Sequence, residues 1–200
     1  MTVMELSPGF ADPVRESALA FRAMLDAMSN PGRVVELPIL ASPPDRFSSA
    51  ATVVALSLLD ADTPVWIDPE LRSEAVESYL RFHAGCPIVE RADQCRFAFL
   101  TASGVPLATE TLPIGTPEYP DRSATAVVLC NSLAGGEVRT LRGPGIANRT
   151  DFAPTGLSTD GWQALSRNAA LFPLGIDTIF VSGNAVAALP RSTRISGGEG

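Results

Sequence analysis

The string LRGPGIAN, residues 141–148, is the part of the chain that most resembles a phosphate-binding loop. Gly143 and Gly145 match the first two glycines of the dinucleotide fingerprint G-x-G-x-x-G, but Asn148 stands at the third. That fingerprint needs a helix directly after the loop, because the helix N-terminus holds the pyrophosphate. The segment after Ile146 reads ANRTDFAPTG, which is polar, contains a proline and lacks helical periodicity. We therefore interpret the string as a sharp turn or bulge between two strands, where exposed amides and Arg142 could still bind an anion.

A second pair of cations lies near the C-terminus, in the string LPRSTRI, which holds Arg191 and Arg194. Two arginines three residues apart on one strand point to opposite faces of the sheet, so these two would not form a single clamp. One could face an anion or a partner while the other is solvated. Together with Arg142, Gly143 and Gly145, they make up the candidate anion-binding set.

All 15 cationic side chains are arginines, and the chain contains no lysine. It therefore cannot form a Schiff base with a carbonyl substrate or with pyridoxal phosphate, and it has no Walker-type loop. This excludes covalent binding of pyridoxal phosphate by this chain.

The chain has three cysteines, Cys86, Cys95 and Cys130, without a CxxC pair, and one histidine, His83. This set is too small for a conventional zinc site or for the cysteine cluster of an iron–sulfur centre. A catalytic cysteine–histidine couple would have to use His83, which falls in the last turn of a predicted helix, an ordinary structural position. We therefore expect reduced, mostly buried thiols, no catalytic residue, no metal and no cofactor.

Composition narrows the class of protein further. The 200 residues carry a net charge of −7, which argues against nucleic-acid binding, because such proteins present a basic face to phosphates. No apolar run is long enough for a membrane helix, and no signal-like segment opens the chain, so we expect a cytoplasmic protein. Hydrophobic residues make up 46 % and the mean hydropathy is +0.17. Either the core is generous, or another chain covers part of the surface.

Helical and strand patterns interleave along the chain. The clearest helix is capped by Asp12, has Pro13 in its first turn, and ends at Asn30-Pro31-Gly32. Its apolar residues recur at helical spacing and predict the face that is buried in the core: Val14, Ala18, Phe21, Leu25 and Met28.

The remaining elements complete the predicted fold. Further helices are expected over residues 48–59, from the Asp68-Pro69 pair to Gly85, and over 157–171. Strands are expected over 33–37, 62–68, 96–102, 124–130, 137–141, 177–183 and 185–195, the last as the second strand of a hairpin. This order predicts a single α/β domain over residues 1–195, with a mixed sheet covered by helices, and a disordered tail, 196–200.

Six strings in this order resemble one known family, the PhnH subunits of the bacterial carbon–phosphorus lyase system. They are FRAMLDAMSNPG (21–32), DTPVW (62–66), LRFHAGCP (80–87), LRGPGI (141–146), FPLGID (172–177) and ALPRSTRI (188–195). Each string alone is unspecific, but the six together span nearly the whole chain.

The resemblance implies a cytoplasmic protein of phosphonate catabolism, in a core complex with the PhnG, PhnI and PhnJ subunits, and a homodimer when alone. In such an assembly the phosphonate displaces adenine from the ribose of ATP, and a radical S-adenosylmethionine subunit later cleaves the carbon–phosphorus bond. The resemblance also implies an α/β fold that is a degenerate relative of the pyridoxal-phosphate-dependent transferases. The family has no settled catalytic residues to carry over to this chain.

Two functions are compatible with these observations. In the first, the chain is a non-catalytic, structural subunit whose apolar surface is covered by itself and by its partners. In the alternative, it is a ligand-handling subunit that binds a phosphonate or a nucleotide phosphate near the Arg142 loop. The absence of a catalytic set favours the first.

Overall fold

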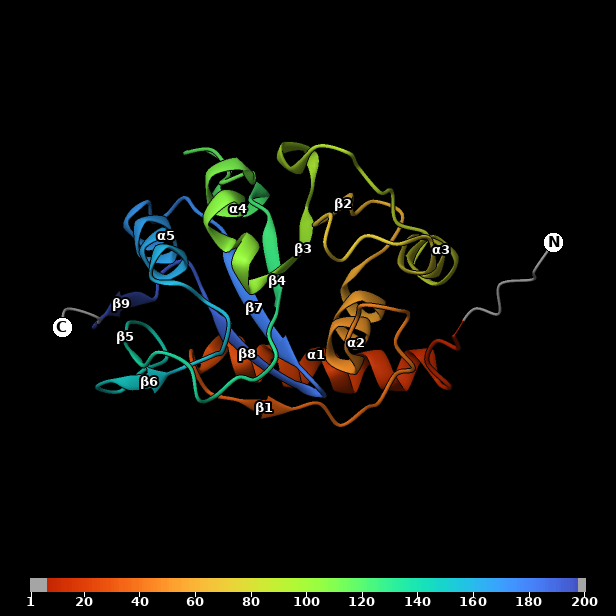
Figure 1. The fold of residues 1–200 in the computed structure, drawn as a ribbon, viewed down its shortest axis with the longest axis horizontal. Helices are drawn as coiled ribbons and strands as arrows, with labels where there is room; N and C mark the ends of the chain where they lie inside the picture. The colour runs from red at the N-terminus through yellow and green to blue at the C-terminus, as the bar shows by residue number, and fades with distance from the viewer. Residues whose placement is uncertain (1–6, 198–200) are drawn as a thin grey trace.

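The computed structural model describes residues 7–197 as one α/β domain with two sheets (Figure 1). The larger sheet has six strands in the order β1-β8-β7-β4-β3-β2. Its strands are β1 (Val35–Glu36), β2 (Val65–Ile67), β3 (Phe97–Thr101), β4 (Thr125–Leu129), β7 (Asp177–Ser182) and β8 (Ala185–Leu189). The strands β2, β3, β4 and β7 pair in parallel. Strand β8 pairs antiparallel with β7, and β1 pairs antiparallel with β8. The prediction of a mixed sheet is confirmed.

Helices cover both faces of this sheet, as Figure 1 shows. One face carries α1 (Pro13–Ser29), α2 (Ser49–Leu58) and α3 (Glu74–His83), and the other carries α4 (Val105–Thr111) and α5 (Thr159–Ala170). Three short 3₁₀ helices complete the helical segments: Ala92–Gln94, Ala102–Gly104 and Pro120–Arg122. The domain therefore has three layers, with a separate hydrophobic core on each side of the sheet.

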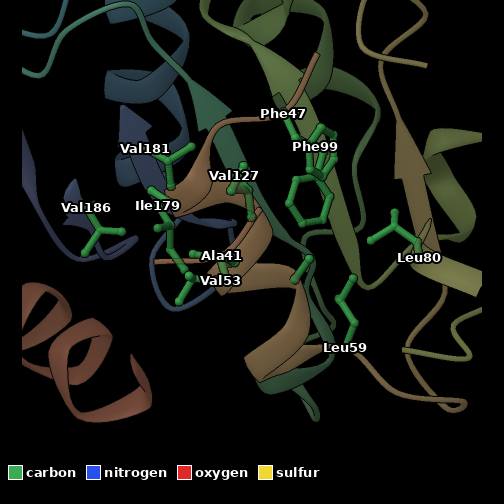
Figure 2. Close-up of a cluster of buried hydrophobic side chains, with 14 of the residues drawn as sticks. Ala41, Phe47, Val53, Leu59, Leu80, Phe99, Val127, Ile179, Val181 and Val186 are labelled. Atoms are coloured by element: carbon green, nitrogen blue, oxygen red, sulfur yellow. The ribbon is translucent and has the colours of Figure 1, made fainter. Parts of the chain in front are cut away.

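Alternation along the central strands fills both cores. Phe99, Val127 and Ile179 are partners across β3, β4 and β7, and they face α1 and α2. Their neighbours in sequence face α4 and α5. Phe47 stacks on Phe99, with ring centroids 5.0 Å apart, beside α2 (Figure 2). Such continuous apolar strands are expected when a parallel sheet is buried on both faces.

The first helix has the predicted bounds, but its predicted core face is wrong. The Asp12 carboxylate accepts a hydrogen bond from the Arg15 amide, as a helix cap should. The residues that α1 buries are Ala20, Met24 and Ala27. In contrast, exposed positions hold most of the predicted stripe: Val14 (83 %), Phe21 (45 %), Leu25 (48 %) and Ala18. Helix α1 has two apolar faces of similar spacing, and the face with alanines faces the sheet because it allows the closer approach.

The third helix begins later than predicted. Its cap is Ser73, whose hydroxyl accepts from the Val76 amide, and not Asp68. Asp68 is buried, and its carboxylate instead accepts hydrogen bonds from the Glu70 amide at 3.0 Å and from the Thr101 amide and hydroxyl. The cap-then-proline pattern was misleading because a short-range acceptor serves a turn as well as a helix start.

Several elements of the structure were not predicted from the sequence. Helix α4 was not predicted, and neither was β6 (Thr150–Phe152). The predicted strand over 185–195 is two strands, because Pro190 ends β8 and the chain then enters the smaller sheet as β9 (Arg194–Ser196). The predicted tail therefore starts too early at Ser196, and residues 198–200 lie outside the described part of the chain.

Candidate functional site

The candidate set lies around the smaller sheet, which has the order β6-β5-β9, with β5 spanning Arg139–Arg142. The strands β5 and β6 are antiparallel, so the 143–149 segment is a turn between two strands, as predicted. A Cβ atom at Gly145 would lie 2.2 Å from the backbone oxygen of Ser29, and Gly145 has a φ of +81°. Glycine is therefore required where the turn packs against the end of α1.

Two arginines of the candidate set meet directly across the smaller sheet. Arg142 and Arg194 are Cα partners in the β5–β9 pair, so their side chains share one face. Both line a cavity of about 640 Å³ with Gly143 and Ser192. The Arg142 Nη1 atom lies 3.5 Å from the Asn148 carbonyl oxygen, a weak contact. Within residues 7–197, neither arginine forms an ion pair with a carboxylate.

The other members of the set lie elsewhere. Arg191 lies in the turn before β9 and pairs with Asp177, with Nη2 2.6 Å from Oδ2. Its Nη1 donates to the Pro120 carbonyl at 2.7 Å, so Arg191 joins segments of the chain and is not free for a ligand. Gly145 lines a neighbouring hollow with Arg33 and Arg149. The structure thus brings together Arg142, Gly143 and Arg194, but not Gly145 or Arg191.

Sequence reasoning missed a buried arginine, Arg139, which is 4 % exposed. Its Nη2 pairs with Glu137 at 2.7 Å, its Nη1 donates to the Gly197 carbonyl, and its guanidinium lies 5.8 Å from the centroid of the Trp162 ring. Within residues 7–197, Arg139 Nε and Trp162 Nε1 have no hydrogen-bond partner. Both residues line a second cavity, of about 390 Å³, together with Arg167. Alternation with the buried Leu141 was the signal that Arg139 faces inward.

The thiols are unsuited to nucleophilic chemistry. Burial raises the pKa of Cys86, and it raises the pKa of Cys95 and of Cys130 to about 12, because a thiolate is costly to bury. Reactive cysteines have a lowered pKa, since the thiolate is the nucleophile.

The only histidine serves the packing of the N-terminal segment. His83 Nε2 lies 3.0 Å from the Ser7 carbonyl oxygen, and its ring lies against Tyr79, with centroids 4.4 Å apart. The Tyr79 hydroxyl donates to the Pro8 carbonyl at 3.2 Å, and burial raises its pKa. Over residues 7–197, no group of three His, Cys, Asp or Glu side chains is placed to hold a metal ion. In the same part of the chain, no helix has the length and apolarity to cross a membrane.

The fold and the site define an α/β protein with arginine-lined cavities and an uncovered apolar helix face. A family model described as "Bacterial phosphonate metabolism protein (PhnH)" matches residues 8–196. The chain therefore belongs to the PhnH family, as the six strings predicted.

Two curated relatives agree with this family assignment. The chain is 39 % identical, over 189 residues and 94 % of each chain, to "Alpha-D-ribose 1-methylphosphonate 5-triphosphate synthase subunit PhnH" of Rhizobium meliloti (strain 1021). It is 34 % identical, over 177 residues, to "Putative C-P lyase subunit protein HtxG" of Stutzerimonas stutzeri. That match covers 88 % of this chain and 84 % of the relative.

Proposed function

We propose that this chain is a non-catalytic, structural subunit of a carbon–phosphorus lyase assembly that breaks down phosphonates. Both curated relatives carry the word subunit in their names. The side chains of the described residues provide binding surfaces and not an activated nucleophile: each thiol has a raised pKa, and His83 packs against Tyr79. The reactive steps then belong to other subunits.

The observation that carries this proposal is the outer stripe of α1, which we define as Val14, Ala18, Phe21 and Leu25. These residues follow one another at intervals of four, three and four, the spacing of a coiled-coil seam. All four are exposed, although the opposite face of the same helix is buried in the core. An apolar row of this kind on a surface marks a site of protein contact.

In the assembly, a helix or sheet of the PhnG, PhnI or PhnJ subunit would cover the outer stripe. When the chain is alone, a second copy would cover it as a homodimer. An antiparallel pair of α1 helices sets Val14 against Leu25 of the second copy and Ala18 against Phe21. It also brings Arg15, which forms no ion pair within residues 7–197, close to Asp26 of the second copy. The same surface then serves both contacts, so the two exclude each other.

We also propose that the fold is a degenerate relative of the pyridoxal-phosphate-dependent transferases, one that no longer binds the cofactor covalently. The lack of lysine supports the loss of cofactor binding, because the chain offers no side-chain amine for the cofactor aldehyde. The proposed structural role includes a cytoplasmic location and needs no cofactor in this chain.

The test is co-expression with the PhnG, PhnI and PhnJ subunits of the same organism, followed by purification through a tag on PhnI. Val14→Glu places a charge on the outer stripe at a position so exposed that folding should survive. We expect its melting temperature to stay within a few degrees of wild type while its recovery with PhnI falls at least tenfold. A matched control is Phe82→Glu, an exposed apolar residue on α3 outside the stripe, which should co-purify normally. Full recovery of folded Val14→Glu would contradict the proposal.

A further inference from the structure

We propose that the cavity between Arg142 and Arg194 binds an organic phosphonate or phosphate ester through its oxyanion. The site lies in the smaller sheet and on no residue of the outer stripe. It goes beyond a purely structural role and would let a structural subunit also hold a ligand of the assembly.

The two arginines repel each other. Like charges directly opposite each other on two strands destabilise a sheet. Arg142 and Arg194 occupy that relationship, and within residues 7–197 no carboxylate pairs with either. Arg191, three residues before Arg194, is held by Asp177 at 2.6 Å. In a chain with a net charge of −7, an unneutralised pair of arginines is a place where a bound anion removes repulsion.

The cavity brings hydrogen-bond donors of two separate segments together. The guanidinium groups supply charged donors suited to an oxyanion with several oxygens, and Ser192 lines the same cavity. Gly143 lets the two turns approach closely, because a Cβ atom there would lie 3.0 Å from the Ser192 backbone oxygen. Two segments distant in sequence, the turn after β5 and the turn before β9, therefore meet around one space.

The C-terminal end of α5 lies at the cavity and opposes the arginines with a partial negative charge. Ala169 and Ala170 line the cavity, and a helix C-terminus carries about half a negative charge. Two of the carbonyls at this end are already bonded, Asn168 by the Leu171 amide at 3.1 Å and Ala169 by the Phe172 amide at 3.4 Å. The remaining partial charge is small beside two full positive charges, so the cavity favours an anion.

The size and the wall of the cavity indicate an organic ligand. A volume of about 640 Å³ is in the range of small-molecule sites and exceeds the needs of a bare phosphate ion. Pro144 and the exposed ring of Phe172 form an apolar wall beside the arginines. A ligand with an oxyanion head and an organic body fits both surfaces. The compound in the printed name of the Rhizobium meliloti relative carries a phosphonate and a triphosphate.

The experiment is titration calorimetry on the full chain with three probes: phenylphosphonate, ATP and inorganic phosphate. We expect saturable binding of phenylphosphonate or ATP, and at least tenfold weaker binding of phosphate. Arg142→Gln and Arg194→Gln should each weaken binding tenfold or more while leaving the melting temperature of the free protein unchanged or higher, because repulsion is removed. Arg149→Gln, an exposed arginine of the same turn that does not line this cavity, is the matched control and should bind normally.

Three results would overturn the site: no saturable heat with any probe, unchanged binding in both arginine variants, or an equal loss in Arg149→Gln. The ligand-binding test and the co-purification test of the structural role can fail independently of each other. Arg142→Gln and Arg194→Gln should still co-purify with PhnI, whereas Val14→Glu should still bind the ligand.

Discussion

The helices α1 and α2 lie on the same face of the large sheet, yet they differ in what covers them. Helix α2 is apolar nearly all round and buries six consecutive residues, from Ala50 to Ala55, among α1, α3 and the strands below. Helix α1 is apolar on two faces and buries only one of them. The helix that is covered within the chain serves stability, and the helix that is left half covered is the one that we propose as a surface for another chain. Apolar content alone does not distinguish these roles.

The largest effect is expected in the core beside α2. Phe99→Ala removes a fully buried ring that stacks on Phe47, and we expect it to lower the free energy of unfolding by about 3–5 kcal/mol. Urea denaturation followed by circular dichroism measures this change. A loss below about 1 kcal/mol would show that the core next to α2 is not the main source of stability.

A smaller loss of stability is expected at the ion pair between Asp177, on β7 of the larger sheet, and Arg191, in the turn before β9 of the smaller sheet. Asp177→Asn keeps the shape of the side chain but removes the negative charge that faces Arg191, and both partners are largely buried. Truncating a fully buried pair costs about 3–5 kcal/mol, and this pair is partly solvated, so we expect about 1–3 kcal/mol. The same urea titration applies. Unchanged stability would mean that Arg191 finds solvent or another acceptor without cost.

On α1, the change that matches Phe99→Ala is Phe21→Ala. The ring of Phe21 is about half exposed, so its loss should lower the free energy of unfolding by only about 1 kcal/mol. Assembly with the other subunits should suffer far more than folding. If Phe21→Ala were as destabilising as Phe99→Ala, the comparison between the two helices would fail.

The smallest effect on stability near neutral pH is expected from the titration of the cysteine thiols. Burial raises the pKa of Cys95 and Cys130 from the ordinary 9.0 to about 12 in the folded chain. Their contribution to stability is therefore fully present below pH 9 and is lost as the pH rises from 9 towards 12. Cys95 is 2 % exposed, whereas Cys130 is partly exposed. At pH 8 we therefore expect a maleimide to leave Cys95 unmodified in the native protein and to label it in urea. Rapid native labelling of Cys95 would contradict its burial.

The sequence predicted the parts of the fold that depend on local chemistry. The cap at Asp12, the continuous apolar strands β4 and β7 and the turn at Gly145 each follow from a residue and its immediate neighbours. The α/β class follows from the order of such elements.

The tertiary relationship between elements could not be predicted from the sequence. Which face of α1 meets the sheet depends on the close approach of α2 and β8, which helical spacing does not encode. The meeting of Arg142 with Arg194 depends on β9 leaving the large sheet after Pro190. The predicted strand over 185–195 held both Arg191 and Arg194, on opposite faces by alternation, whereas in the structure Arg191 precedes β9.

The most direct test of the structural role is the accessibility of one position on the outer stripe. Cys86 and Cys95 are buried but Cys130 is partly exposed, so Phe21→Cys is made in a Cys130→Ser background, where maleimide labelling at pH 7 reports on residue 21. We predict rapid labelling of the isolated chain at a concentration low enough to dissociate the proposed homodimer, and at least tenfold slower labelling after assembly with PhnG, PhnI and PhnJ. Labelling of Val138→Cys, an exposed position away from α1, corrects for reagent access. Equal rates at residue 21 in the free chain and in the assembly would contradict the account.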